Sequence, residues 1–381
     1  MISISKLYCG RAGASDDLRF PKERGRKPIV VFNCTSRCNL SCIHCYSASD
    51  SSCHGEELST AQAKNLLSQL ADYRCPVVLF SGGEPLLRPD IFELLQHAAA
   101  LDLPTVLSTN GTLIDEQTAA RLKSAQVRYV GISLDGPATE HDRFRRCHDS
   151  FRLAVKGLHC CAKAGLSTGI RFTMTADNIE SVETIFDIAL AADVKRICFY
   201  HLINSGRAAE MKIAAPSFVQ TRKALDSVID LAERFVEPGQ IDQVLTVGNH
   251  ADGPYLLLKM KSKNHPLYGQ AIELLRRSGG NRIGQNIASV SSDGAVHPDQ
   301  FWRNYSLGNI TQTPFGVIWD NAADPVLNIL RNRDKFKDPR CARCRWFELC
   351  KGNFRCLADD VSIENWKNEP TCFLTDEEIE T

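Results

Sequence analysis

The chain has 381 residues, and its 45 Lys plus Arg balance its 45 Asp plus Glu. This length suffices for one large core and a smaller satellite domain, and a hydrophobic fraction of 43% excludes a disordered chain. The zero formal net charge argues against nucleic acid as the main partner, because phosphate binding usually needs a basic surplus.

The apolar pattern also argues against a membrane protein and a secreted one. No apolar run approaches the roughly 20 residues that a membrane-spanning helix needs. Residues 1–20 lack the apolar stretch of a secretory signal. We therefore expect a cytoplasmic protein with no membrane partner. Residues 1–27, which are basic and contain glycine, are predicted to form an N-terminal arm.

Between residues 28 and 235 short β-rich runs alternate with helical patterns. Each run is almost continuously apolar, which is typical of a parallel strand covered on both faces. Six such units predict an α/β fold, a partial (β/α)6 barrel with its chemistry at the C-terminal ends of the strands. Ser59 and Asp90 suit helix N-caps. The predicted strands are 28–33, 77–81, 105–110, 129–134, 169–175 and 196–202, and the predicted helices are 59–72, 90–101, 115–125, 151–164, 179–192 and 216–235.

Sixteen cysteines are many for a chain of this length. In a reducing cytosol such a number indicates metal binding rather than disulfides. Three of them lie at 38, 42 and 45, directly after the first predicted strand, and five lie between 341 and 372. Since no cysteine lies between Cys198 and Cys341, the distribution predicts two separate metal sites.

The first group has the spacing C-x3-C-x2-C, formed by Cys38, Cys42 and Cys45. Three thiolates on one loop can bind three irons of a 4Fe–4S cubane and leave the fourth iron open. A catalytic metal needs such an open position and a structural one does not. A zinc knuckle or incidental buried cysteines are the alternatives, and the position of the motif at the start of a βα array disfavours both.

This motif and the segments after it resemble the radical S-adenosylmethionine (SAM) superfamily over about residues 28–235. The resemblance implies that the open iron binds the amino and carboxylate groups of SAM. One-electron reduction then releases a 5′-deoxyadenosyl radical, which abstracts a hydrogen from the substrate. The resemblance also places His44 where relatives have an aromatic residue near the adenine.

Motifs at the ends of the next strands match the places where the family binds SAM. The SGGEP turn resembles the site for the amino group, since glycines allow close approach and a glutamate can pair with an ammonium. The STNG and SLDG motifs suit ribose or carboxylate contacts, and helix capping is their alternative. An arginine on the fifth strand suits the SAM carboxylate or a structural ion pair. The predicted SAM-binding residues are Ser81, Gly82, Gly83, Glu84, Ser108, Asn110, Ser133, Asp135 and Arg171.

The pattern changes after the barrel. Residues 236–285 are predicted to be a bridging helical region with a helix at 267–277. Residues 286–381 are predicted to form a small α+β iron–sulfur domain. Its elements are a hairpin at 286–299 around the Asp293-Gly294 turn, a short strand or turn at 307–310 and a helix near 325–331.

The C-terminal cysteines have the spacing C-x2-C-x5-C-x5-C, with one more cysteine beyond. Cys341, Cys344 and Cys350 are predicted ligands, and the fourth is either Cys356 or Cys372. We favour Cys372, because a ligand from outside the loop would close the C-terminal tail over the site. Four thiolates give a closed site, suited to an auxiliary 4Fe–4S cluster or to zinc.

This region resembles the SPASM and Twitch extensions of radical SAM enzymes. The full SPASM pattern has further cysteines near residues 280–300, where this chain has Asn281, Asp299 and Gln300. We therefore expect one auxiliary cluster and not two, with SAM and two 4Fe–4S clusters as the cofactors in all. The other cysteines are interpreted as small core or surface residues; they are Cys9, Cys34, Cys53, Cys75, Cys147, Cys160, Cys161, Cys198 and Cys356.

Four C-terminal stretches are similar to the NirJ family, the radical SAM proteins of haem d1 biosynthesis. They are HPDQFW (297–302), LGNI (307–310), CARCRWFELCKGNFR (341–355) and CFLTDEEI (372–379). The resemblance implies action on the propionate side chains of 12,18-didecarboxysirohaem, with a low-potential electron donor such as flavodoxin or ferredoxin. A related haem-synthesis decarboxylase, a peptide maturase and a non-catalytic iron–sulfur or zinc scaffold are the alternatives.

A tetrapyrrole that bears several carboxylates needs cationic groups in a broad pocket. A cluster of basic residues follows the fourth strand. These residues either bind substrate carboxylates or form a solvated basic surface. A histidine at the end of the sixth strand is either a substrate contact or a satisfied core residue, and we favour the latter. The candidate substrate residues are His141, Arg143, Arg145, Arg146 and His201.

Overall fold

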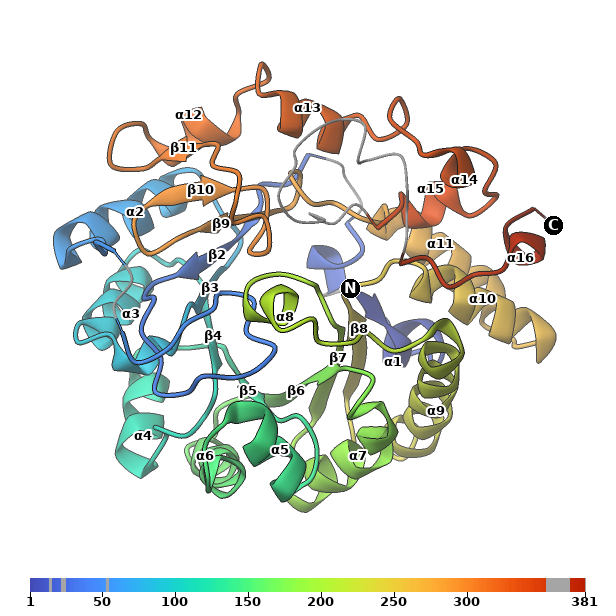
Figure 1. The fold of residues 1–381 in the computed structure, drawn as a ribbon, viewed down its shortest axis with the longest axis horizontal. Coiled ribbons are helices and arrows are strands. Elements are labelled where there is room, and N and C mark those ends of the chain that lie inside the picture. The colour runs from blue at the N-terminus through green and yellow to red at the C-terminus, as the bar shows by residue number, and fades with distance from the viewer. Residues whose placement is uncertain (14–15, 22–24, 53–54, 354–370, 381) are drawn as a thin grey trace.

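The computed structural model describes residues 1–381 apart from 14–15, 22–24, 53–54, 354–370 and 381. Its strands form one eleven-stranded sheet with the order β1-β8-β7-β6-β5-β4-β3-β2-β9-β10-β11. The strands from β2 to β8 pair in parallel with their neighbours. In Figure 1 these strands lie at the centre, and helices surround them on the outside. This is a partial barrel, and the predicted α/β class is confirmed.

All six predicted strands are present. They are β2 (Ile29–Asn33), β3 (Val78–Ser81), β4 (Thr105–Thr109), β5 (Tyr129–Ser133), β6 (Thr168–Met174) and β7 (Arg196–His201). The helices between and after them are α2 (Thr60–Asp72), α3 (Ile91–Ala100), α4 (Glu116–Ser124), α6 (Ser150–Lys163), α7 (Val182–Ala191) and α9 (Phe218–Val236). Ser59 caps α2 in a capping box with Gln62. Asp90 lies at the N-cap of α3, but its carboxylate accepts from the guanidinium of Arg88 instead (2.7 Å).

The sheet extends beyond the six predicted strands on both sides. Strand β8 (Gln243–Val247) lies beside β7, in the region predicted to be a helical bridge. Strand β1 (Ile2–Ser3) pairs antiparallel with β8 and leads into α1 (Ile4–Leu7). The prediction of an arm is therefore wrong for residues 2–8, whose apolar side chains are buried. On the other side β9 (Ile287–Val290) pairs with β2.

The second part of the chain is built from short elements. Strands β9 and β10 (Ala295–His297) form the predicted hairpin, and β11 (Gly308–Asn309) pairs with β10. The helices here are α10 (Asp252–Ser262), α11 (Tyr268–Ser278), α12 (Phe315–Trp319), α13 (Pro325–Arg331), α14 (Pro339–Ala342), α15 (Phe347–Cys350) and α16 (Asp376–Glu380). Two further short helices, α5 (Ala138–Arg145) and α8 (Arg207–Glu210), were not predicted.

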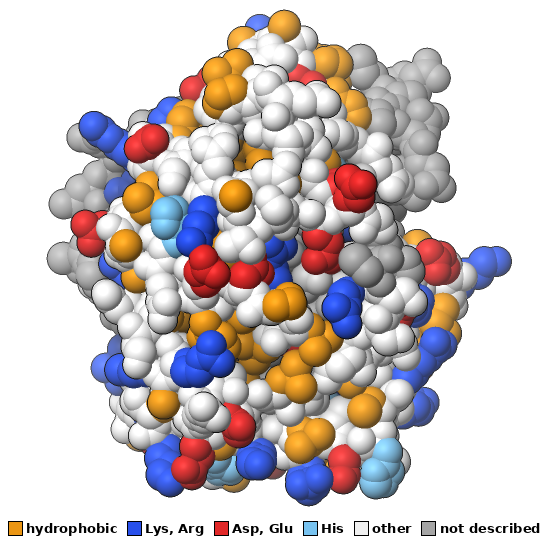
Figure 2. Space-filling model, turned by 90° about the vertical axis from the view of Figure 1, so that its left-hand side faces the viewer, with side chains coloured by type: hydrophobic (Ala, Val, Ile, Leu, Met, Phe, Trp, Pro, Cys, Tyr) orange, Lys and Arg blue, Asp and Glu red, His pale blue; other side chains and the backbone are white. Residues whose placement is uncertain are grey.

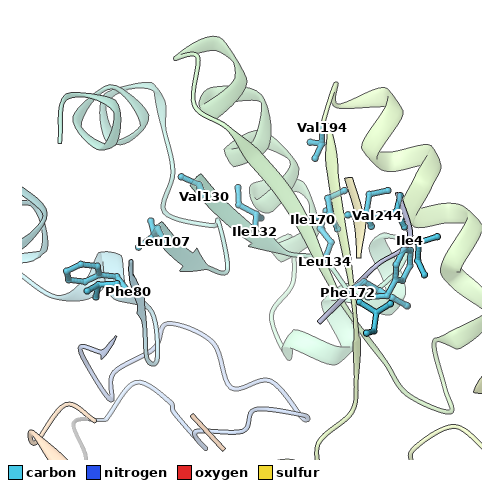
Figure 3. Packing of buried hydrophobic residues seen from close by; sticks show 14 of the residues in the cluster. Ile4, Phe80, Leu107, Val130, Ile132, Leu134, Ile170, Phe172, Val194 and Val244 are labelled. Carbon is cyan, nitrogen blue, oxygen red and sulfur yellow. The ribbon is translucent and has the colours of Figure 1, made fainter. Parts of the chain in front are cut away.

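One apolar cluster runs through the barrel. Figure 3 shows side chains of this cluster, including Phe80, Leu107, Ile132 and Phe172, on neighbouring strands. Burial of a large apolar side chain stabilises the fold by roughly 1.5–3 kcal/mol, so these strands give the residues at their ends a rigid support. On the face in Figure 2, acidic and basic side chains are interspersed. Among the described residues, no helix combines the length and the apolar composition needed to cross a bilayer.

Candidate functional site

A cavity opens at the C-terminal ends of the parallel strands. Its walls come from the loop after β2, from the ends of β3 to β7 and from residues 300–301 of the C-terminal part. The predicted residues that line this cavity are Cys38, Cys42, His44, Cys45, Ser81, Gly82, Gly83, Ser108, Asn110, Ser133, Arg145, Arg171 and His201. The topology thus brings together residues that are up to 163 positions apart in the chain.

The three cysteines of the first group lie on the loop after β2, and Cys38 and Cys42 are buried. Burial raises the pKa of the Cys38 thiol to about 12, and it raises the pKa of Cys42 as well. Iron binding would favour their deprotonated form, because the thiolate and not the thiol ligates a metal ion. No three Cys, His, Asp or Glu side chains of the described residues converge tightly enough to hold one metal ion. A cubane binds each thiolate at a different iron, so three cysteines around one cavity fit that group.

An arginine that the sequence analysis missed holds the cysteine loop in place. Arg207, at the start of α8, donates to the backbone oxygens of Cys42 (2.7 Å), Ala48 (2.9 Å) and Ser49 (2.9 Å). Its own backbone N–H donates to the oxygen of Cys45 (2.9 Å). Four hydrogen bonds from one residue therefore fix the C-terminal half of the motif and the residues that follow it. No local pattern marks Arg207, because its partners lie about 160 positions earlier.

The SGGEP turn packs directly against the chain that leads to Cys38. The N–H groups of Gly83 and Glu84 donate to the oxygens of Thr35 and Arg37, both at 2.8 Å. A Cβ atom on Gly83 would lie 2.1 Å from the oxygen of Arg37. Both glycines of the turn line the cavity, so their small size serves the close approach of two backbones as well as access to a ligand.

We expect Gly83→Ala to disturb the cysteine loop. The added methyl group must displace the backbone at Arg37, so stability should fall by about 1–3 kcal/mol, and less iron should be retained. Denaturant unfolding and iron analysis measure both effects. Gly269→Ala is the matched control, because a Cβ at Gly269 has no atom within 4 Å. Normal stability and iron content in Gly83→Ala would contradict the expectation.

Glu84 does not line the cavity, although it was predicted to contact SAM. Its carboxylate is fully buried and accepts from the hydroxyl of Thr109 (2.8 Å) and the N–H groups of Asn110 (2.8 Å) and Leu86 (3.2 Å). Burial raises the pKa of Glu84. The residue therefore fixes the end of β4 and places Asn110, whose amide donates to Asn39 on the cysteine loop (2.9 Å).

Asp135, the acid of the SLDG motif, also lies behind the cavity wall. The guanidinium of Arg145 is 2.5 Å from its carboxylate, and Nε2 of His44 is 3.7 Å away on the other side. Burial alone would raise the pKa of Asp135, but Arg145 and then His44 more than offset this effect and hold it below its usual value. His141 is buried, and its Nδ1 accepts from the N–H of Asp135 (3.1 Å).

The basic group predicted to bind substrate carboxylates does not form one surface. Arg145 points inward, and its guanidinium donates to the sulfur of Cys42 (3.5 Å). The side chain of Arg143 is 60% exposed on the outside of α5, and Arg146 donates to Met211 at the surface. The helix, unpredicted here, turns these residues in different directions. The prediction that these residues form one group that binds substrate carboxylates is therefore wrong.

The last two candidates lie on neighbouring strands of the sheet and line the cavity. Arg171 on β6 donates to the hydroxyl of Ser108, and its guanidinium lies 4.8 Å from the ring centre of Tyr200. His201, at the end of β7, lines the cavity, and its Nε2 is 2.9 Å from the carboxylate of the buried Asp252. Both residues are therefore placed to meet a ligand.

The second cysteine group lies around α14 and α15. Cys341 is in α14 and Cys350 ends α15, while burial raises the pKa of Cys344. The C-terminal tail folds back over this region. Three backbone oxygens of the tail accept hydrogen bonds from this region. The guanidinium of Arg340 donates to Cys372 (3.5 Å). The N–H of Arg345 donates to Ile379 (3.0 Å), and the indole of Trp346 donates to Glu378 (2.9 Å). Cys356 and Cys53 lie outside the described residues, so the choice of Cys372 stays a prediction.

The three positions that lack SPASM cysteines have other roles. Asn281 is buried, and its N–H donates to the oxygen of Cys350 (2.9 Å). The carboxylate of Asp299 accepts from the N–H groups of Phe301 (2.8 Å) and Trp302 (3.1 Å). Gln300 lines the main cavity. The C-terminal part therefore contributes to the wall of the first site.

Comparison with known proteins identifies the family. Residues 32–189 match the radical SAM superfamily, and residues 282–345 match the iron–sulfur cluster-binding domain named SPASM. The whole chain is 43% identical to the Fe-coproporphyrin III synthase of Methanosarcina barkeri and covers 99% of that protein. The chain belongs to the radical SAM superfamily. It is an enzyme that uses SAM and two iron–sulfur clusters, as the resemblance implied.

Two further similarities refine this assignment. The radical SAM chain is 35% identical to the pre-heme d1 synthase of Dinoroseobacter shibae, over 93% of its own length and 88% of that protein. Together with the first relative, this places it in the radical SAM haem-synthesis family and confirms its likeness to NirJ. The crystal structure of Streptococcus suis SuiB bound to SAM has the same fold, with a TM-score of 0.67 at 18% identity, over 86% of this chain and 73% of that chain.

Proposed function

We propose that this radical SAM enzyme removes carboxylated side chains from 12,18-didecarboxysirohaem and forms iron coproporphyrin III. The observation that carries the proposal is the 43% identity to the Fe-coproporphyrin III synthase of Methanosarcina barkeri, which extends over the entire chain. Coproporphyrin III keeps four propionates, so its formation from this substrate requires loss of the two remaining acetate groups.

Cys38, Cys42 and Cys45 would hold the SAM-binding cluster. When bound, this cluster and SAM supply the 5′-deoxyadenosyl radical. Ser81, Gly82 and Gly83 line the cavity beside the cysteine loop and would take the amino group of SAM. The predicted SAM residues on β4 to β6 line the same cavity; they are Ser108, Asn110, Ser133 and Arg171. Among these four residues, Arg171 carries the cation that suits a carboxylate.

His201 is the residue that we assign to the substrate. It stands at the end of β7 and lines the cavity together with Gln300. Its ring is held by Asp252, which is buried at the start of α10. A histidine whose orientation is fixed by a carboxylate is suited to donate to a carboxylate or to bind a metal centre. Both groups are present in an iron tetrapyrrole with acidic side chains.

The auxiliary cluster would be held by Cys341, Cys344, Cys350 and Cys372. Four thiolates leave no open position, which suits electron transfer better than direct chemistry. We expect the electron for SAM cleavage to come from a low-potential donor such as flavodoxin or ferredoxin.

A second candidate function is the formation of the haem d1 precursor, in which propionates are lost instead of acetates. Two observations favour it: the 35% identity to the pre-heme d1 synthase of Dinoroseobacter shibae and the similarity of the C-terminal stretches to the NirJ family. Both candidates share the cavity and the radical chemistry. They differ in which side chain of the same two rings faces the radical.

Product analysis separates the two candidates. The enzyme is incubated under anaerobic conditions with SAM, dithionite and 12,18-didecarboxysirohaem, and the tetrapyrrole product is identified by mass. We expect the mass of iron coproporphyrin III, formed together with 5′-deoxyadenosine and only when SAM is present. Loss of two propionates would establish the haem d1 route, and an unchanged tetrapyrrole beside active SAM cleavage would rule out both.

A further inference from the structure

A buried arginine lies against the sulfur of a predicted cluster ligand. Nη1 of Arg145 donates to Sγ of Cys42 at 3.5 Å, within the range for a hydrogen bond to sulfur. Its Nη2 is 2.5 Å from a carboxylate oxygen of Asp135. Only 9% of the arginine side chain and none of the aspartate side chain is exposed. The charged pair thus stands directly behind the cysteine loop and away from bulk solvent.

The backbone holds this arginine at the loop. The N–H of Ile43, between Cys42 and Cys45, donates to the oxygen of Phe144 at the end of α5 (2.9 Å). Arg145 is the next residue, so its side chain must start within reach of the motif. On the other side of Asp135, His141 accepts from the backbone N–H of that residue. Hydrogen bonds to the cysteine loop and to the segment after β5 therefore hold α5, and with it Arg145, in place.

A buried ion pair gives little net stability, because both charges lose their hydration. The position of this one beside a sulfur suggests a use beyond stability. One-electron reduction makes an iron–sulfur cluster one unit more negative, and N–H donors to its sulfurs stabilise the reduced form more than the oxidised form. A cation at this distance should therefore raise the reduction potential of the cluster.

We propose that Arg145 is a positioning residue that eases the one-electron reduction of the SAM-binding cluster, and that Asp135 holds it in place and attenuates its charge. The inference rests on the proposed role of Cys42 as a cluster ligand. One electron enters from a low-potential flavodoxin or ferredoxin and no proton is required. Among the residues that the structure describes, His44, His141 and Glu84 also interact electrostatically with Arg145.

The arrangement predicts the direction in which each substitution shifts the midpoint potential of the SAM-binding cluster. Arg145→Gln removes the cation and should shift the midpoint potential of the SAM-binding cluster downward. Asp135→Asn removes the counter-charge and leaves the cation, so the midpoint should shift upward. Arg145→Lys keeps the charge and should fall between Arg145→Gln and the wild type. Arg143→Gln, on the exposed side of the same helix, is the matched control and should leave the midpoint unchanged.

The measurement is an anaerobic redox titration of the holoenzyme followed by electron paramagnetic resonance. Addition of SAM perturbs the signal of the cluster that binds it and separates this signal from the auxiliary one. Unchanged midpoints in both Arg145→Gln and Asp135→Asn would overturn the proposal. If Arg145→Gln takes up no cluster, Arg145→Lys and Asp135→Asn decide the sign. No substrate is added, so a failed product assay would leave this result intact.

Discussion

Cys42→Ala is expected to abolish 5′-deoxyadenosine formation while the C-terminal cluster persists. Loss of one of the three thiolates leaves the SAM-binding cluster with too few ligands, so the iron content should fall from about eight to about four atoms per chain. Because the second cysteine group lies on separate elements around α14 and α15, its cluster should form normally. Iron analysis and a reductive SAM cleavage assay measure the two effects.

Cys147→Ala is the matched control for this experiment. Cys147 packs beside Cys38 and Cys42 but is outside the motif. Its replacement should leave both the iron content and SAM cleavage unchanged. Loss of the N-terminal cluster in Cys147→Ala would mean that a fourth thiolate closes the site, and the open iron on which SAM binding depends would not exist.

Arg207→Ala should have the second largest effect. It removes three hydrogen bonds from a charged donor to the backbone of the cysteine loop, and each such bond contributes about 1.5–3 kcal/mol when its acceptor stays buried. The loop should lose its fixed geometry, with an N-terminal cluster that is bound weakly and lost quickly. We expect at least a tenfold drop in SAM cleavage and a faster loss of iron to a chelator.

The conservative variant Arg207→Lys tests whether geometry or charge matters. A lysine keeps the cation but lacks the planar fork that reaches several oxygens at once. We expect it to restore only part of the iron retention. Full retention in Arg207→Ala would show that the loop keeps its shape without the arginine, contrary to the structure.

Much of the barrel could be predicted because its signals are local. Each strand is an apolar run of four to seven residues, and Ser59 carries its capping box within four positions. Strand β8 was not predicted because its run QVLTV lies between polar segments, in a region interpreted as helical. Residues 2–8 looked like part of a basic arm, and only their pairing with β8 explains why they are buried.

The site was predictable where a motif marks it and unpredictable where contacts span long distances. The cysteines and the GG turn lie at the cavity as expected. Glu84 and Asp135 belong to motifs, but their carboxylates are satisfied by β4 and by Arg145, which no spacing rule reveals. Arg145 was predicted to be one of several neighbouring residues that bind substrate carboxylates, but helix α5 turns it inward toward Cys42. Charge in a sequence does not show direction.

The C-terminal tail joins the two sites physically. Phe373, the residue after Cys372, is buried and stacks on the ring of His201 (ring centroids 6.4 Å apart). If Cys372 binds iron, loading of the auxiliary site anchors the segment that supports a wall of the main cavity. Maturation of the enzyme would then be sequential. A chain that lacks its second cluster would also have an incompletely formed cavity wall for the tetrapyrrole.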